Sequence, residues 1–199
     1  MADSLGEWEP LSVAEVAGLL AGVQAPWWIA GGWAIDLFVG EPGRAHGDID
    51  VLVLRRDLGR VQEHLRGWDL HAADPPGVLR PWRNGEQLPA TVHDIWCRPS
   101  AASPWALQLM VDDTDGDDWV YRRDARVRRP VSTLAGPAST SDRLVLAPEV
   151  QLLYKSARPR PKDVDDRRRC LPVLDPDRRA WLRNALTLVD PAHAWLADG

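Results

Sequence analysis

The sequence predicts an α+β fold, α/β-like in its layering, in which helices flank a mixed β-sheet and a small C-terminal helical part follows. Residues 48–54 form an apolar run that alternates poorly, which is typical of a strand buried on both faces. Segments with helical spacing of apolar residues lie on both sides of that strand. Beyond residue 148 the pattern is helical, which predicts the C-terminal part.

The composition is that of an ordinary globular protein, with 45% hydrophobic and 27% charged residues. The net charge of −5 argues against a nucleic-acid partner, because nucleic-acid-binding surfaces are basic. No apolar run approaches the ~20 residues that span a bilayer, and the acidic N-terminus argues against a signal peptide. Cys97 and Cys170 fit neither a disulfide framework nor a zinc site. We therefore expect a cytoplasmic protein without a membrane partner, as a monomer or a homodimer.

Helices and strands are expected to alternate at the N-terminal end. Ser12 and Glu15 form a capping box for a helix over residues 10–24. A strand over 26–30 leads into a helix over 31–39, which a Gly-Glu-Pro-Gly segment ends. The paired glycines at the start of this second helix are therefore next to the end of a strand.

A helix, a strand and a long loop should follow the buried strand. The pattern predicts a helix from Asp57 to about Arg66, a short strand over 68–71 and a loop over 75–89. A loop of this length in a compact domain is often functional. Its Trp82 either lines a substrate pocket or packs on the sheet.

An acidic segment, residues 112–118, interrupts the last predicted strands. A strand over 91–97 contains Asp94, and the strands 105–111 and 119–121 flank the acidic segment as a hairpin. We expect the segment to be a solvated hairpin tip. The alternative is an anionic rim for a cationic substrate.

The C-terminal region predicts a linker and three helices. Residues 131–141 are rich in small residues and proline, so we expect them to link a main domain over 1–130 to a helical region over 142–199. The helices are expected over residues 148–157, 162–170 and 177–189.

Asp48 and Asp50 are the strongest candidates for a chemical site. Residues two apart on a strand share a face, and two carboxylates on one face repel each other unless a cation lies between them. Hard divalent ions such as Mg²⁺ take oxygen ligands of this kind. Gly31 and Gly32 open a helix whose backbone N–H groups can hold phosphate.

Two strings carry a family resemblance. They are Trp28-Ile29-Ala30-Gly31-Gly32-Trp33-Ala34-Ile35-Asp36 and Arg44-Ala45-His46-Gly47-Asp48-Ile49-Asp50. Together they resemble the signature of the polymerase β-like nucleotidyltransferase superfamily, and most closely that of the aminoglycoside 2″-adenylyltransferases and lincosamide nucleotidyltransferases. The superfamily's serine after the first glycine is replaced here by a second glycine.

The resemblance implies a two-metal nucleotidyl transfer that uses ATP or another NTP as co-substrate. In such a site Asp48 and Asp50 hold two Mg²⁺ ions, while Asp94 completes the catalytic metal's shell or takes the proton of the acceptor hydroxyl. The resemblance also implies nucleotide contacts from Gly31, Gly32 and Arg44 in the two strings. A Pro-Glu…Lys…Lys-Asp arrangement adds Lys155 and Lys162, which are equal candidates for the contact with the triphosphate.

Fold similarity leaves the acceptor open. The leading hypothesis is transfer of a nucleoside monophosphate, AMP in the first place, to a hydroxyl of a small molecule, above all an aminoglycoside antibiotic. The acidic segment 112–118 and Glu86 could bind its ammonium groups only if they fold toward the cleft, with Trp82 as a further substrate contact. The alternatives are a toxin-type enzyme that modifies a protein or tRNA, and a non-catalytic nucleotide-binding module.

Overall fold

The computed structural model describes residues 6–197. Within this range the strands form one nine-stranded sheet in the order β4-β3-β5-β6-β2-β1-β9, and β7 and β8 extend it from β6. The strands are β1 (Trp27–Ile29), β2 (Asp50–Leu54), β3 (Asp69–Ala73), β4 (Leu79–Pro81), β5 (Asp94–Arg98), β6 (Leu107–Asp115), β7 (Asp118–Val120), β8 (Arg128–Pro130) and β9 (Leu144–Val145).

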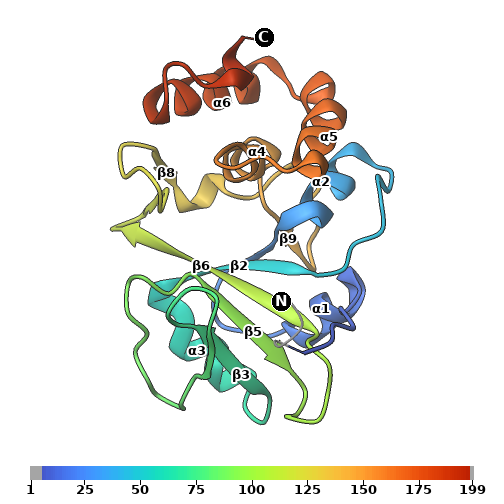
Figure 1. Cartoon of the computed structure of the whole chain (residues 1–199), viewed down its shortest axis with the longest axis vertical. Helices are drawn as coiled ribbons and strands as arrows, with labels where there is room; N and C mark the ends of the chain where they lie inside the picture. The colour runs from blue at the N-terminus through green and yellow to red at the C-terminus, as the bar shows by residue number, and fades with distance from the viewer. Residues whose placement is uncertain (1–5, 198–199) are drawn as a thin grey trace.

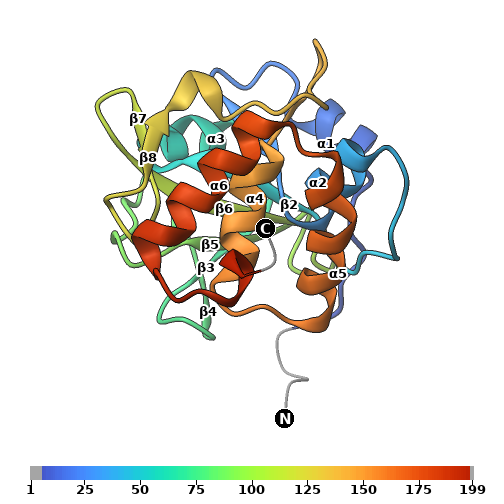
Figure 2. The same ribbon diagram turned by 90° about the horizontal axis from the view of Figure 1, so that it is seen from above.

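Helices cover both faces of this sheet (Figure 1). Figure 1 shows α2 and the C-terminal helices above the sheet and α1 and α3 below it, while Figure 2 shows α4 running across the sheet between α5 and α6. The α-helices are α1 (Val13–Leu19), α2 (Gly31–Val39), α3 (Leu58–His64), α4 (Pro148–Ser156), α5 (Pro161–Cys170) and α6 (Pro176–Val189). The short 3₁₀ helices are η1 (Arg55–Asp57), η2 (Val131–Thr133), η3 (Leu171–Val173) and η4 (Ala194–Leu196).

The predicted mixed sheet is confirmed by its pairings. β2 pairs with β6 in parallel and β1 pairs with β9 in parallel, whereas β1–β2, β5–β6, β3–β5 and β3–β4 are antiparallel. The last four residues of β2, 51–54, are completely buried. This explains why the apolar run of β2 does not alternate.

The helix that begins at the glycine pair has the predicted bounds. α2 ends where Gly40 adopts a left-handed conformation with φ of 87°, which glycine tolerates without strain. The first helix is shorter than expected. Ser12 and Glu15 form the predicted capping box, but α1 ends at Leu19, a few residues before the left-handed Gly22.

Three segments differ from the prediction. Asp48 precedes β2, which begins at Asp50, so a loop rather than a shared strand face brings the two carboxylates together. β4 forms inside the expected 75–89 loop. β6 continues through Asp115, so most of the acidic segment is strand instead of hairpin tip.

Asp112 is the clearest correction within that segment, because its side chain is 0% exposed. Of the other acidic residues there, Asp113 pairs with Arg55 and Asp115 pairs with Arg128. The expected division of the chain at residues 131–141 stays a prediction. No helix in residues 6–197 has the length and apolar character needed to cross a membrane.

Candidate active site

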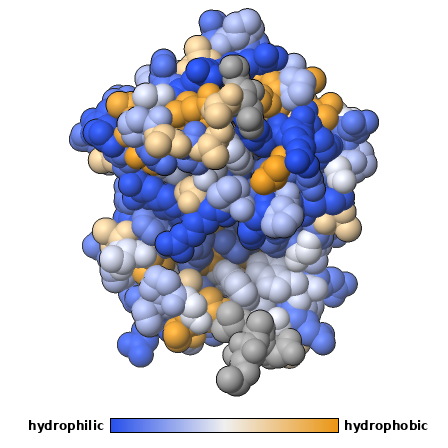
Figure 3. All heavy atoms as spheres, turned by 45° about the horizontal axis from the view of Figure 1, so that its top comes forward, coloured by the Kyte–Doolittle hydropathy of each residue, from blue (hydrophilic) through white to orange (hydrophobic). Residues whose placement is uncertain are grey.

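A cleft of about 500 Å³ lies where the C-terminal helices meet the sheet. Figure 3 shows hydrophilic surface across the middle of the molecule, below the C-terminal helices. The cleft is lined from the sheet side by Asp48, Asp50, Asp94, Gln108 and Met110, from α2 and its following loop by Gly31, Gly32 and Arg44, and from elsewhere by Arg122, Arg123, Gln151, Tyr154, Lys155, Arg158, Arg160, Lys162 and Asp163.

The three predicted carboxylates all line this cleft. Asp50 is the first residue of β2 and Asp94 the first of β5, and β6 lies between these two strands. Gln108 of β6 donates a hydrogen bond to Asp94 over 3.0 Å. Burial and the charges of Asp48 and Asp94 raise the pKa of Asp50 to about 7, although Lys155 and Lys162 act in the opposite direction. The carboxylates therefore interact electrostatically, as a site for a cation requires.

Gly31 is required by the close approach of Asp50. Its φ is 65°, and a Cβ atom at this position would lie 2.1 Å from Asp50 Oδ2. The Gly31 N–H donates to the side-chain oxygen of Gln151 over 2.7 Å. The Gly31 N–H is therefore already bonded to Gln151 of α4. Gly31 contributes to the site because its lack of a side chain leaves room for the Asp50 carboxylate.

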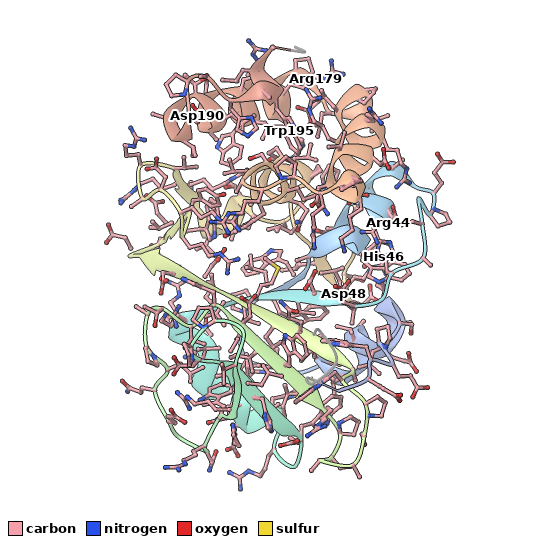
Figure 4. All side chains as sticks on the ribbon, in the orientation of Figure 1. Arg44, His46, Asp48, Arg179, Asp190 and Trp195 are labelled. Atoms are coloured by element: carbon pink, nitrogen blue, oxygen red, sulfur yellow. The ribbon has the colours of Figure 1, made fainter. Side chains whose placement is uncertain are left out.

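Gly32 is required by the loop that leads to Asp48. A Cβ atom on Gly32 would lie 2.4 Å from the His46 ring and 2.6 Å from Arg44 Nη2. The serine found at this position in the superfamily would collide with both side chains. The two sequence strings therefore form one packed unit, and Figure 4 shows Arg44, His46 and Asp48 in succession between α2 and the start of β2.

Asp36 holds that unit together. Its carboxylate accepts hydrogen bonds from His46 Nε2 at 2.7 Å, from the Gly43 N–H at 3.1 Å and from Arg169 Nη1 at 2.6 Å. Burial opposes ionisation, but the three hydrogen bonds hold the pKa of Asp36 below its ordinary value. Through Asp36, Arg169 near the end of α5 is thereby fixed to α2 and to the loop that carries Arg44.

The two lysines differ in their surroundings. Lys155 is buried and pairs with Asp163 at 3.1 Å and with Asp166 at 2.7 Å. Arg44 also approaches Asp166, at 3.7 Å. Lys162 is partly exposed at the cleft, and no ion pair to it occurs within the described residues. Lys162 is thus the better placed of the two for a direct contact with phosphate, whereas Lys155 is committed to two carboxylates.

Sequence reasoning missed several cleft residues. Gln151 lies four residues before Lys155 on the same helix and three before Tyr154, and this helical spacing was a usable signal. Arg122 and Arg123 lie in an irregular segment before β8, which begins only at Arg128, so no helical or strand pattern marks them.

Comparisons with known proteins agree with this geometry. A family model for aminoglycoside-2″-adenylyltransferases matches residues 12–73, which include both sequence strings. No curated protein matches the chain. The lincomycin-bound lincosamide antibiotic adenylyltransferase LnuA has a TM-score of 0.55 at 16% identity, covering 83% of this chain and 100% of that one. The solution structure of the antibiotic-resistance factor ANT(2″)-Ia has a TM-score of 0.52 at 17% identity, covering 87% of this chain and 88% of that one.

The chain has the nucleotidyltransferase fold. The family match covers the motif-bearing N-terminal part, and the structural similarity extends over most of the chain. Together they indicate a nucleotidyltransferase enzyme that is similar to the aminoglycoside adenylyltransferases.

Two predicted substrate contacts of this nucleotidyltransferase do not line the cleft. Trp82 and Glu86 border a separate cavity of about 620 Å³ beside α3. Trp82 is buried and donates its indole N–H to the Glu86 carbonyl over 2.9 Å, and the Glu86 carboxylate pairs with Arg80 at 2.8 Å. The packing alternative for Trp82 therefore agrees better with the structure.

The three cleft carboxylates have the right donor atoms for a divalent cation, but they are not grouped closely around one point. Asp48, Asp50 and Asp94 present hard oxygen donors, and the pKa of Asp50 is raised first by burial and then by repulsion from Asp48 and Asp94, which a cation would relieve. Across residues 6–197 no group of three or more acidic, histidine or cysteine side chains is arranged to hold a metal ion. Mg²⁺ usually keeps water and substrate phosphate among its ligands, so these carboxylates would hold it together with the nucleotide.

Proposed function

We propose that this nucleotidyltransferase transfers a nucleoside monophosphate, AMP in the first place, from an NTP to a hydroxyl group of a small antibiotic molecule. One observation carries the proposal. Three carboxylates from two segments, Asp48 and Asp50 around the start of β2 and Asp94 at the start of β5, line a single cleft together with the start of α2 and with Lys155 and Lys162. The similarity to antibiotic adenylyltransferases supports the same class of acceptor.

In the proposed reaction Asp94 takes the proton of the acceptor hydroxyl. The acceptor oxygen forms a bond to the α-phosphorus, the bond from that phosphorus to the α,β-bridging oxygen breaks, and pyrophosphate leaves. Lys162 contributes a positive charge beside the leaving pyrophosphate. Asp48 and Asp50 would hold Mg²⁺, which when bound neutralises phosphate charge and polarises the reacting oxygens.

The finer choice of acceptor rests on resemblance. LnuA is described as a lincosamide adenylyltransferase bound to lincomycin, and the family model is that of enzymes acting on aminoglycosides. The electrostatic argument for an aminoglycoside loses its basis, because neither Glu86 nor the acidic segment 112–118 lines the cleft. Aminoglycosides and lincosamides are therefore both acceptors to test.

The test is a mass-spectrometric assay of the full chain with Mg²⁺, each NTP and both antibiotic classes. We expect one antibiotic to gain the mass of a nucleoside monophosphate. Asp94→Asn should lower the transfer rate by about 10²-fold or more, because the base is lost, while ATP binding is retained. Asn keeps the oxygen that accepts from Gln108, so the substitution leaves local packing intact.

Asp165→Asn is the matched control for this assay, since Asp165 is exposed on α5 and pairs only with Arg168 among the described residues. It should leave the transfer rate unchanged. Nucleotide addition to a protein or a tRNA, with no antibiotic modified, would contradict the proposal.

A further inference from the structure

The sheet order gives the cleft two ends. The strands β2, β6 and β5 lie side by side, with Asp50 opposite Gln108 and Asp94 opposite Met110, and Gln108 donates a hydrogen bond to Asp94, so these residues cross the floor of the cleft from β2 to β5. Gly31, whose Cα the Asp50 carboxylate approaches closely, lies at the β2 end. In the proposed reaction the nucleotide takes the β2 end, next to the start of α2, and the acceptor takes the Asp94 end, where its hydroxyl loses the proton.

The Asp94 end continues into a further cavity of about 310 Å³. Asp94, Arg122 and Arg123 line both this cavity and the main cleft. The other lining residues are Ala73, Pro76, Gly77, Thr91 and His93. A molecule whose hydroxyl reaches Asp94 can thus extend into this space without entering the nucleotide end.

This acceptor cavity is positively charged. Asp94 is its one carboxylate among the described residues, and it faces two guanidinium groups. Within residues 6–197 neither Arg122 nor Arg123 forms an ion pair with a carboxylate. The nitrogen Nη1 of Arg122 is buried without a hydrogen-bond partner. Asp112 accepts its side-chain hydrogen bonds from Trp119 and Tyr154, and the nearby charge of Arg122 acts on it without an ion pair, opposing the rise of its pKa.

Both arginines are held in place by α4. The guanidinium of Arg122 lies 5.4 Å from the centre of the Tyr154 ring, and that of Arg123 lies 5.7 Å from it. Arg123 also donates to the Tyr154 carbonyl over 3.0 Å. Their position beside Asp94 is therefore fixed before a ligand binds, which lowers the entropic cost of recognising one.

We propose that the acceptor carries an anionic group, a phosphate or a carboxylate, which Arg122 and Arg123 bind while the neighbouring hydroxyl reacts at Asp94. Guanidinium groups recognise such oxyanions through charge-assisted hydrogen bonds. The inference rests on the proposed nucleotidyl transfer, but it replaces the cationic class of acceptor that the similarity to aminoglycoside adenylyltransferases supports with an anionic one. A polycationic aminoglycoside would place ammonium groups beside two arginines that form no ion pair within the described residues and beside one carboxylate, so it should be a poor acceptor.

A matched set of sugars tests this charge preference. The full chain is first saturated with Mg²⁺ and α,β-methylene-ATP, which fills the nucleotide end without reacting, and is then titrated by calorimetry. The probes are glucose 6-phosphate, glucose and glucosamine, which differ chiefly in charge, together with tobramycin. We expect glucose 6-phosphate to bind about tenfold more tightly than glucose, as one added charge-assisted contact predicts, and the two cationic probes to bind most weakly.

The arginine variants identify the surface responsible. Arg122→Gln with Arg123→Gln should abolish the preference for glucose 6-phosphate and leave the affinity for the ATP analogue within about twofold. Arg66→Gln removes the same charge from an exposed position near the end of α3 and should change neither affinity. Tighter binding of glucosamine or tobramycin than of glucose 6-phosphate, or an unchanged preference in the double variant, would overturn the inference.

A parallel transfer assay with ATP separates this inference from the proposed function. Transfer to tobramycin that is insensitive to both arginines would retain the function and overturn the anionic acceptor. Arginine-dependent binding of glucose 6-phosphate, without nucleotide transfer to any hydroxyl compound, would retain the anion site and overturn the function.

Discussion

Asp112 is the residue that sequence patterning described least well. It stands first in a run of acidic residues that looks like a solvated turn, yet it lies inside β6 and is 0% exposed. Trp119 and Tyr154 both donate to its Oδ2, whereas its Oδ1 is buried without a partner. Burial raises the pKa of Asp112 despite these hydrogen bonds. The donors come from β7 and α4, so the local sequence could not reveal them.

We predict that Asp112→Asn increases the free energy of unfolding, and does so more at pH 8 than at pH 4.5. The raised pKa means that the native state binds more protons than the unfolded state. The free energy of unfolding therefore falls as the pH rises above about 4, the pKa of this carboxyl in the unfolded chain. Asn keeps an oxygen for both donors and carries no charge. Urea denaturation at the two pH values measures the effect.

Asp112→Ala is the companion variant. It leaves two buried donors unpaired, which should cost about 1–3 kcal/mol for each. Equal destabilisation by Asn and Ala at both pH values would show that the charge of Asp112 has no part in stability.

At the level of elements, the sequence predicted which segments are helices better than it predicted how they are joined. α2 has the expected bounds because the paired glycines and Gly40 mark its ends. The contacts that fix it cross the chain, from Gly31 to Gln151 and from Asp36 to Arg169. No periodicity relates residues that far apart, so the role of Asp36 as an anchor required the structure.

We predict that Arg169→Gln lowers the melting temperature and raises the KM for ATP, with a smaller change in kcat. The substitution removes a hydrogen bond to buried Asp36 and one to the Glu41 carbonyl, so the loop carrying Arg44 loses its anchor. Loss of a charged hydrogen bond of this kind typically costs about 1.5–3 kcal/mol. Thermal denaturation and steady-state kinetics measure the two effects.

Arg168→Gln is the control for this prediction, because Arg168 is exposed and pairs with Asp165. If both variants behave alike, the link between α5 and α2 has no influence on nucleotide binding.

At the scale of the whole molecule, the cleft is formed by residues that lie far apart in the sequence, from Gly31 to Asp163. The sequence predicted the carboxylates and the lysines individually, and the cleft does contain all of them. It did not predict the basic acceptor end, because Arg122 and Arg123 belong to an irregular segment between β7 and β8. Nor could the sequence show that Trp82 and Glu86 border a different cavity.

We predict that ATP with Mg²⁺ stabilises the folded protein by about 2.7 kcal/mol at 100 times its dissociation constant. Because the ligand contacts the sheet and the C-terminal helices together, one cooperative unfolding transition should shift as a whole in calorimetry. ATP with EDTA should give a smaller shift, and Lys162→Gln should reduce the shift with Mg²⁺. A shift confined to part of the transition would contradict a ligand shared by both parts.

Leu146 and Ala147 are the whole connection between β9 and α4, and both are bonded to the rest of the protein. The Leu146 N–H donates to the Ile29 carbonyl and the Ala147 N–H to the Leu134 carbonyl, each over 2.8 Å. One turn later Gln151 accepts from Gly31. Swinging α4 away from the sheet would break all three bonds, so this joint cannot act as a hinge. We therefore expect α4 to keep its place on the sheet throughout the proposed reaction, and the turnover rate should not depend on solvent viscosity through movement at this joint.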